Sequence, residues 1–216
     1  WVKVTIHRPL EGVMKSVTVS RAKSGRYFVS IQVEVECKEP ELAGGEVGID
    51  LGVKDFVTLS SGEKIELPGY YRKAQRQRRR LSRQLSRKQP GSRNWEKARL
   101  RLARLEEHIA NQRLDFHHRL SRKLVEGNRL VAMEDLHVRG MMGNHHLAQS
   151  IGDAGWSAFA KMLEYKGAWY GCEVVNVDRW YPSSKMCSKC GTIVERLPLS
   201  IREWKCPECG SIHDRD

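Results

Sequence analysis

The stretch VGIDLGVKDFVTLS, residues 47–60, places a carboxylate within a segment that otherwise has the pattern of a core strand. The apolar residues of VGIDLG alternate, which predicts a β-strand, and FVTLS continues as a second strand after a turn. Asp50 interrupts this pattern, and Gly48 and Gly52 stand two residues away on either side. Because burying an unpaired carboxylate costs several kcal/mol, an acid at this position predicts a partner group or a bound metal ion.

Acidic residues also end a second strand-like segment and close the chain. Glu134 and Asp135 lie in the segment RLVAMEDL, and Asp214 and Asp216 lie in the terminal HDRD. Solvation at a strand end would explain any one of these acids. Three carboxylates from separate elements favour a site of oxygen ligands for Mg²⁺ or Mn²⁺, which supports phosphodiester hydrolysis. We interpret the glycines beside Asp50 as room for a substrate. Alternation leaves open whether Glu134 or Asp135 faces this site.

Four of the six cysteines form two pairs with the spacing of metal ligands. Cys187-x-x-Cys190 and Cys206-x-x-Cys209 are separated by fifteen residues, which suits one tetrahedral zinc ion. A glycine follows each pair and permits a tight turn that brings backbone N–H groups to the thiolates. Because four thiolates fill the coordination shell, we expect a structural zinc rather than a catalytic one.

The remaining cysteines and one histidine are expected to have other roles. Cys37 and Cys172 lie in strand-like segments and are predicted to be packing residues, while His213 could replace a zinc ligand but is not required. Four free thiols or a thioredoxin-like redox site would fit the paired spacing less well. The pattern indicates a reducing compartment and not a secreted disulfide framework, so we expect a cytoplasmic protein.

The positive charge of the chain is concentrated in one segment. The chain has a formal net charge of +12, and residues 70–129 hold 19 Lys and Arg against 5 Asp and Glu, a net of +14. This distribution indicates a polyanion partner, and nucleic acid fits better than a membrane surface or an acidic protein. A solvated helix face is the simpler alternative, but acidic residues that would alternate with the basic ones are scarce. The candidate nucleic-acid contacts are Arg76, Arg78, Arg79, Arg80, Arg83, Arg87, Lys88, Arg179 and Lys185.

A second basic segment, RWYPSSK at residues 179–185, interleaves cations with aromatic side chains. Such a segment suits stacking on nucleic-acid bases. Packing of the cysteine module against the rest of the chain would use the same residues equally well. No apolar run approaches the length of a membrane span, and no segment resembles a signal peptide.

Hydrophobic periodicity predicts an α/β chain whose strands precede, separate and follow its helices. The expected elements are strands at 2–6, 16–20 and 27–36, a linker at 39–46, strands at 47–52, 56–60 and 64–67, helices from 70 and after a break at 89–92, a strand at 129–136, a loop at 140–152, a helix at 154–170 and a strand at 172–180. This order is typical of an RNase H-like α/β domain that carries a basic helical hairpin and a metal module.

Three motifs, GIDLGVKDFVTLS, VAMEDLHVRGM and CSKCG…CPECGSIHDRD, resemble in this order those of TnpB-type proteins of the OrfB family. These are transposon-encoded RNA-guided DNA nucleases related to compact type V CRISPR effectors. The resemblance covers essentially the whole chain and implies a RuvC-like domain with Asp50, Glu134 and Asp216 as catalytic acids and Asp214 as the alternative. It also implies catalytic Mg²⁺, a guide RNA and a target DNA.

The resemblance divides the chain into parts. They are the last strands of an oligonucleotide-binding-like β-barrel at 1–40, a RuvC-like domain at 41–180 with the hairpin at about 70–128, a zinc ribbon at 181–212 and the start of the third RuvC motif at 213–216. Family members begin with a helical recognition lobe and an earlier barrel strand that this sequence lacks. We therefore expect a nuclease half that is inactive or non-specific by itself.

Two other functions remain open from the sequence. A non-catalytic nucleic-acid-binding protein would use the basic hairpin and the zinc ribbon, but it would not need Asp50 between two glycines. A DNA transposase or resolvase would use the same acids without a guide. RNA that copurifies with the protein would separate this last possibility from an RNA-guided nuclease.

Overall fold

The computed structural model describes residues 4–6, 9–36, 44–178, 180–198, 201 and 203–214, with the backbone alone at Ser183 and Asp214. Its mixed α/β content agrees with the prediction. The chain forms two compact units: the first comprises Trp1–Glu41 and Gly69–Leu120, and the second Leu42–Pro68 and Ser121–Asp216. Within the described residues, no helix is both long enough and apolar enough to cross a membrane.

A two-stranded antiparallel sheet opens the first unit. Strands β1 (Val13–Arg21) and β2 (Tyr27–Glu34) pair so that the valines and isoleucine of β2 lie opposite apolar residues of β1, two valines and Met14. Gly25, with a φ of +83°, forms the predicted turn between them. The alternation predicted for β2 is confirmed, because its valines and isoleucine are half-buried and the intervening residues are exposed. Residues 4–6 are not in a strand, although the sequence predicted one there.

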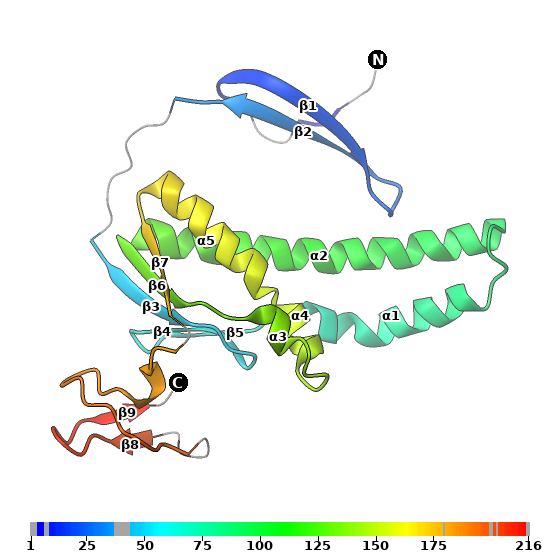
Figure 1. Cartoon of the computed structure of the whole chain (residues 1–216). Helices are drawn as coiled ribbons and strands as arrows, with labels where there is room; N and C mark the ends of the chain where they lie inside the picture. The colour runs from blue at the N-terminus through cyan, green and yellow to red at the C-terminus, as the bar shows by residue number, and fades with distance from the viewer. Residues whose placement is uncertain are drawn as a thin grey trace. The chain divides into compact units, whose positions relative to one another are not determined.

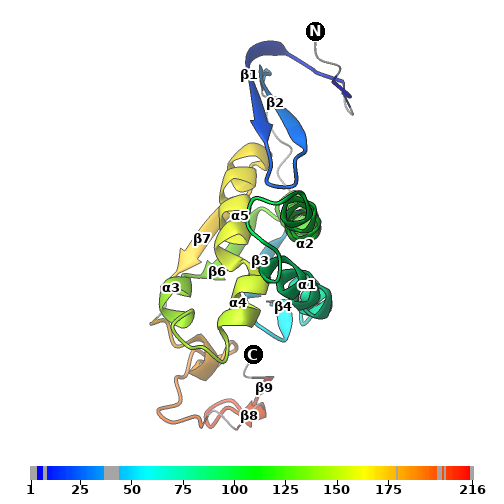
Figure 2. The same cartoon turned by 90° about the vertical axis from the view of Figure 1, so that its right-hand side faces the viewer.

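Two long helices form the basic hairpin, which belongs to the first unit as far as Leu120. Helix α1 (Tyr70–Ser86) and helix α2 (Arg93–Gly127) lie side by side and are joined at the predicted break (Figures 1 and 2). Ser92 caps α2, since its Oγ accepts a hydrogen bond from the Trp95 N–H at 3.1 Å. The hydrophobic periodicity that predicted this second helix is confirmed, because apolar residues along one stripe of α2 are buried: Ala98, Ile109, Leu120 and Leu124.

A five-stranded sheet is the centre of the second unit. Its strand order is β5-β4-β3-β6-β7, with β3 antiparallel to β4 and parallel to β6, and with β6 parallel to β7. The bounds are β3 (Glu46–Asp50), β4 (Asp55–Leu59), β5 (Lys64–Glu66), β6 (Leu130–Glu134) and β7 (Glu173–Val177). The three parallel strands therefore end at one common edge of the sheet.

Helix α5 (Trp156–Tyr170) supplies the core that packs on this sheet. Phe159 of α5 and Phe56 of β4 are both fully buried, and their rings meet edge to face with centroids 5.0 Å apart. Glycines in the left-handed conformation flank the helix, Gly155 before it and Gly171 after it. One buried polar contact joins α5 to the end of α2, where Lys166 Nζ donates to Ser121 Oγ at 2.7 Å.

The region predicted as a loop after β6 contains two short helices, α3 (Val138–Met141) and α4 (Ala148–Ala154). The expectation of a loop at 140–152 is therefore wrong at its two ends and holds for residues 142–147. Ile151 and Ala154 are buried at a spacing of one helical turn, which explains the helix. The glycines and histidines around them hide this short pattern in the sequence.

The cysteine module is small and has little regular structure. It contains a 3₁₀ turn, η1 (Ser183–Lys185), and two short antiparallel strands, β8 (Glu203–Lys205) and β9 (Ile212–Asp214). Its buried cluster consists of Cys187, Trp204 and Cys206. Apart from the cysteines, the apolar core described for the module is therefore small, with Trp204 buried and Val194 and Leu197 packed against it.

Replacing Phe159 with alanine should lower the free energy of unfolding of the second unit by about 3–5 kcal/mol, because a fully buried ring leaves a cavity. Trp169→Ala is the matched control, since Trp169 lies on the same helix with 63% of its surface exposed. Its loss should be below about 1 kcal/mol. Chemical denaturation followed by circular dichroism measures both, and equal losses would contradict this assignment of the core.

Candidate metal centres

Two of the predicted acids end neighbouring parallel strands. Asp50 is the last residue of β3 and Glu134 the last residue of β6. Ile49 pairs with Met133 in the parallel register, so the residues that follow them, Asp50 and Glu134, lie side by side. Because paired residues of parallel strands project from the same face, the two carboxylates lie on one face at the carboxyl edge of the sheet.

The pairing answers the question of Glu134 or Asp135. Glu134 is the half-buried end of β6 and pairs with Val177 of β7. Asp135 follows the strand and is exposed, and its backbone N–H donates to the Val177 carbonyl at 3.0 Å. Glu134 is therefore the acid that continues the register beside Asp50.

Asp50 differs from the prediction in its exposure. Its neighbours Ile49 and Leu51 are buried, but Asp50 itself is exposed, so the expectation of a buried acid is wrong. The physical reason is its position, because β3 ends at Asp50 and the residue projects from the strand end, on the face opposite Ile49. The alternating pattern identifies a strand but does not show where the strand ends.

One of the two flanking glycines, Gly52, has a local explanation that differs from the predicted open space. A Cβ at Gly52 would lie 2.7 Å from the Asp55 carbonyl oxygen, so the turn into β4 excludes a side chain there. The Gly52 N–H also donates to the Phe56 carbonyl at 3.3 Å. At Gly48 a Cβ would make only ordinary contact with Ser60, 3.6 Å away. The turn, and not a substrate, thus accounts for Gly52.

The third predicted acid cannot be placed beside the other two. Asp216 lies outside the described residues, and so do Arg179 and Cys37. Asp214, the alternative, is the last residue of β9 and is described by its backbone alone.

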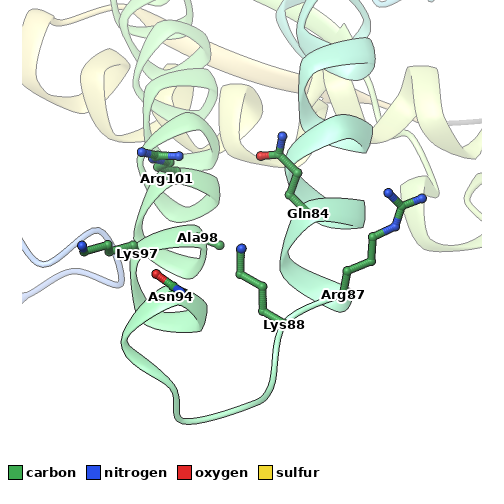
Figure 3. A pocket seen from close by; sticks show the side chains of 7 residues that line it. All are labelled: Gln84, Arg87, Lys88, Asn94, Lys97, Ala98 and Arg101. Atoms are coloured by element: carbon green, nitrogen blue, oxygen red, sulfur yellow. The ribbon is translucent and has the colours of Figure 1, made fainter.

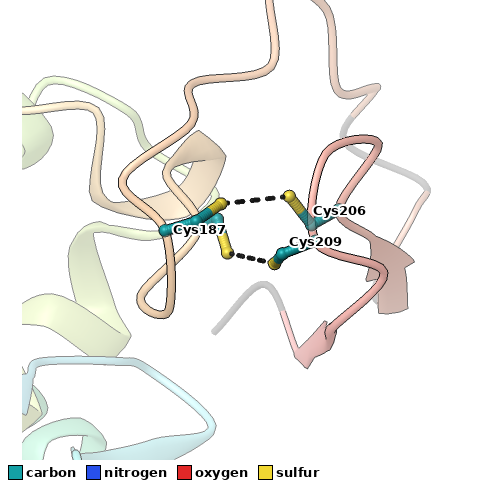
Figure 4. Close-up of side chains that lie close together, drawn as sticks. Cys187, Cys206 and Cys209 are labelled. Carbon is teal, nitrogen blue, oxygen red and sulfur yellow. Dashed lines mark hydrogen bonds between the residues drawn. The ribbon is translucent and has the colours of Figure 1, made fainter.

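The four cysteines of the two pairs converge and form a possible metal-binding site. All four sulfur atoms lie within 4.8 Å of one another, and they come from the two loops of the module (Figure 4). Two sulfur pairs, Cys187 with Cys209 and Cys190 with Cys206, are each separated by 3.5 Å. A tetrahedral zinc with Zn–S bonds of about 2.3 Å needs sulfur atoms about 3.8 Å apart, so the arrangement fits zinc.

The two loops that carry these cysteines have the same backbone turn. Gly191 and Gly210 adopt φ values of +76° and +71°. Their N–H groups donate to the carbonyls of Cys187 at 2.8 Å and Cys206 at 3.0 Å, which closes each loop. The predicted role of these glycines in a tight turn is confirmed, since residues with a Cβ rarely adopt this conformation.

Two further residues lie beside the thiols: Ser211, which the sequence did not single out, and His213, which it named as an alternative ligand. Ser211 Oγ lies 3.3 Å from Cys187 Sγ and 3.0 Å from Cys209 Sγ, and His213 Nε2 lies 3.0 Å from Cys187 Sγ. His213 is thus a neighbour of the cluster, and the four-sulfur set is complete without it. Ser211 Oγ and His213 Nε2 are in turn 2.7 Å apart. Ser211 directly precedes β9 and His213 lies in it, so their spacing of two residues could have suggested this arrangement.

Hydrogen bonds favour the thiolate form at Cys187 and Cys209, whereas burial and the neighbouring thiols of Cys190 and Cys209 raise the pKa of Cys206 to about 11. Burial raises the pKa of Cys187, but the Ser211 hydroxyl and the N–H groups of Cys190 and Lys189 outweigh it and lower this pKa to about 5. The Ser211 hydroxyl also lowers the pKa of Cys209. Burial raises the pKa of Cys172, which lies outside the cluster and is buried as predicted for a packing residue.

The predicted nucleic-acid contacts fall into different surroundings. On or just after α1, Lys88 is half-buried, and the exposed cations are Arg76, Arg79, Arg80, Arg83 and Arg87. Arg78 instead forms an ion pair with Glu106 of α2 and lies 5.4 Å from the Tyr71 ring. Lys185 Nζ donates to the Glu195 carbonyl at 3.1 Å, so it contributes to the fold of the cysteine module. Near it, the Trp180 side chain is 85% exposed.

Comparison with known protein families places this chain. The OrfB_IS605 family, described as “Probable transposase”, matches residues 29–145. The family described as “Cas12f1-like, TNB domain” matches residues 156–216, which include the cysteine module. Since the first match covers more than half of the chain, the chain belongs to the OrfB_IS605 family.

Two relatives carry functional names. A Streptomyces pristinaespiralis protein named as an inferred RNA-guided DNA endonuclease is 48% identical over 211 residues, which cover 97% of this chain and 52% of the relative. InsQ of Escherichia coli (strain K12), named in the same way, is 33% identical over 222 residues, covering 95% of this chain and 55% of the relative. The chain therefore spans about half the length of these relatives.

The fold is also similar to part of a solved CRISPR-Cas12f chain. In a cryo-EM structure of a Cas12f ternary complex, the match has a TM-score of 0.57 at 21% sequence identity. It covers 93% of this chain and 43% of the Cas12f chain. At this level of identity the match is evidence of the fold alone.

Replacing Cys187 with serine should abolish stoichiometric zinc binding, because it removes one of four converging thiolates. The purified wild-type chain should contain about one zinc ion, as measured by inductively coupled plasma mass spectrometry. Cys172→Ser is the matched control, a buried cysteine outside the cluster, and should keep the zinc. Zinc retained by the Cys187 variant would rule out this ligand set.

Replacing Ser211 with alanine should weaken zinc binding by about 10–100-fold, since groups that hydrogen-bond to metal ligands orient them. Competition with a chromophoric chelator measures the affinity. Ser188→Ala is the control, because Ser188 is an exposed serine between two ligands. If both variants released zinc alike, the Ser211 contacts would have no specific role.

Proposed function

We propose that this chain is the nuclease half of an RNA-guided, divalent-metal-dependent DNA endonuclease associated with an insertion sequence. The observation that carries the proposal is the register that sets Asp50 beside Glu134 at the ends of two parallel strands. Membership of the OrfB_IS605 family and the names of the two relatives support the reaction class. Because the chain spans about half of those relatives, guide recognition and target choice rest on the longer protein.

The central domain is, in this proposal, RuvC-like. The mixed sheet of the second unit supports it, since three antiparallel strands are followed by two parallel strands that return through helices. The proposed parts are the barrel strands at 1–40, the RuvC-like domain at 41–180 with the hairpin at about 70–128, the zinc ribbon at 181–212 and the third motif at 213–216.

The acids act as hard ligands in this scheme. Asp50 and Glu134 present carboxylate oxygens from one face of the sheet, and Asp216, or Asp214 in its place, would complete the set. Carboxylates of this kind suit Mg²⁺, which would supply an activated water and stabilise the leaving oxygen of a phosphodiester. The exposure of Asp50 supports this role, because a ligand that meets a polymeric substrate has to be accessible.

The zinc has a structural role in the proposal. Four thiolates occupy all positions of a tetrahedral ion, so none is left for a substrate or a water. The ion would hold together two loops that share only a small apolar core.

Guide RNA and target DNA are the proposed partners. The net charge of +14 in residues 70–129 supports a polyanion on the helical hairpin. The Cas12f chains of similar fold come from structures titled as a ternary complex and as a complex with sgRNA and target DNA.

A transposase that cuts without a guide is the second candidate, and the description of the OrfB_IS605 family favours it. Its acids would perform the same hydrolysis. Ribonucleic acid that copurifies with the chain and resists exchange at high salt would exclude this candidate. A third possibility is a protein that binds nucleic acid without catalysis. Metal-dependent cleavage of DNA by the chain would exclude it.

Asp50→Asn and Glu134→Gln should each abolish Mg²⁺-dependent cleavage of single-stranded DNA while leaving RNA binding intact. Each change removes an anionic metal ligand and keeps the size of the side chain. Asp135→Asn is the matched control at the adjacent exposed position and should retain activity. The measurement is cleavage of a labelled strand in the presence and absence of Mg²⁺, with fluorescence anisotropy for RNA binding.

A second readout is independent of turnover. Mn²⁺ binding followed by electron paramagnetic resonance should be lost in the Asp50 and Glu134 variants and kept in the Asp135 variant. If the control lost Mn²⁺ as the other two did, the register would not define the site. If Mn²⁺ bound to the wild-type chain without any cutting, cleavage would require the rest of the longer protein.

A further inference from the structure

A polar hollow of about 530 Å³ lies between the last turn of α1 and the first turns of α2. Figure 3 shows Lys88 reaching from the end of α1 toward α2. Its polar lining consists of Gln84, Arg87, Lys88, Asn94, Lys97 and Arg101. Four cations and two amides from both helices therefore surround one space within the first unit.

The hollow has room because the apolar residue of α2 at this position, Ala98, has a small side chain. Ala98 is buried, with 6% of its surface exposed, and it is the apolar member of the lining. Pockets for small organic ligands are lined mainly by apolar and aromatic side chains. A lining of cations and amides is instead suited to an anion with several oxygen acceptors.

The four cations of the hollow have no carboxylate within salt-bridge distance among the described residues. Other cations of the first unit do have such partners, and on the helices these pairs include Arg78 with Glu106, Arg99 with Glu96, and Arg119 with Asp115. Glu96, the acid in the first turn of α2, forms its ion pair with Arg99 and not with a cation of the hollow. Like charges that converge without counter-charges repel one another, so an anion between them would relieve the repulsion.

The helix dipole explains only part of this arrangement. It favours Arg87 and Lys88, which stand at the C-terminal end of α1. It disfavours Lys97, which lies near the N-terminal end of α2. The dipole therefore gives no reason for the cations that α2 adds, Lys97 and Arg101, whereas an anion in the hollow would account for both sets.

We propose that this hollow binds phosphate groups of a nucleic-acid backbone and so fixes one end of the basic hairpin to the strand that it holds. The inference rests on the proposed function, in which the hairpin contacts nucleic acid, and it names the place of contact. Lys88 and Arg101 would donate from the two helices to phosphate oxygens, and Gln84 and Asn94 would add amide donors. Such contacts fix position and give no sequence preference.

The test compares two double variants of the 216-residue chain. Lys88→Gln with Arg101→Gln removes one cation of the hollow from each side. Lys73→Gln with Arg104→Gln removes the same charge from exposed positions on the same helices, outside the hollow. Binding is measured by fluorescence anisotropy without divalent cations, so it does not depend on cleavage. A labelled single-stranded DNA and a labelled RNA duplex of equal length distinguish the source of the phosphate.

The hollow variant should bind at least one of the two probes on the order of tenfold more weakly. The slope of its log affinity against log salt concentration should fall by the amount that corresponds to about one to two phosphate contacts. The control variant should change both quantities less. Equal losses in the two variants would overturn the hollow and leave a diffuse basic surface, while the proposed nuclease function would stand. If the wild-type chain bound neither probe, the proposal that the hollow binds phosphate would also be wrong. The proposed nuclease function would then be decided by the Mg²⁺-dependent cleavage assay alone.

Lysine footprinting on the wild-type chain removes any dependence on folding of the variants. Acylation of Lys88 and Lys97 should fall when the bound probe is present, and Lys73, an exposed lysine of α1 outside the hollow, should react as before. Unchanged reactivity of Lys88 and Lys97 at saturating probe would refute the proposal.

Discussion

The parallel pairing of β3 with β6 is the constraint on which the proposed catalytic site depends. Parallel neighbours cannot be joined by a tight turn, so the chain between them passes through two further strands and both long helices before it returns. The pairing then sets residues that are distant in sequence side by side, with Ile49 opposite Met133 and the acids one position further. A shift by one residue would turn one carboxylate to the opposite face and separate the pair.

Much of this arrangement could be predicted from the sequence, and the exceptions have physical causes. Alternation located β3, β4 and β6, and the break at Pro90 and Gly91 separated the two helices. Alternation predicted neither the exposure of Asp50 nor the choice of Glu134 over Asp135, which only the family resemblance implied, because both depend on where a strand ends and which strand it pairs with. The interpretation of Gly52 as room for a substrate was wrong because the backbone of the turn after β3, which excludes a side chain there, cannot be recognised from alternation.

The cysteine site was more predictable than the acids because its ligands are local. Spacing within each pair and a glycine after it determine the loop geometry almost without tertiary structure. Charge counting was less informative for the hairpin. In the sequence, Arg78 and Arg87 belong to the same basic run, but in the fold Arg78 is bound to Glu106 while Arg87 lines an open hollow. Only the packing of α1 on α2 separates cations that hold the hairpin together from cations that remain available.

The small size of the apolar core in the cysteine module has a consequence for the cell. Where a bound ion replaces a hydrophobic core, folding and metal uptake become one equilibrium, so the folded fraction follows the free zinc concentration. Strand β9 begins only three residues after Cys209, the last sulfur ligand, and the final acid of the sequence lies two residues beyond its end. With the proposed zinc, the supply of a metal that takes no part in hydrolysis would govern how much of the protein is competent to cut.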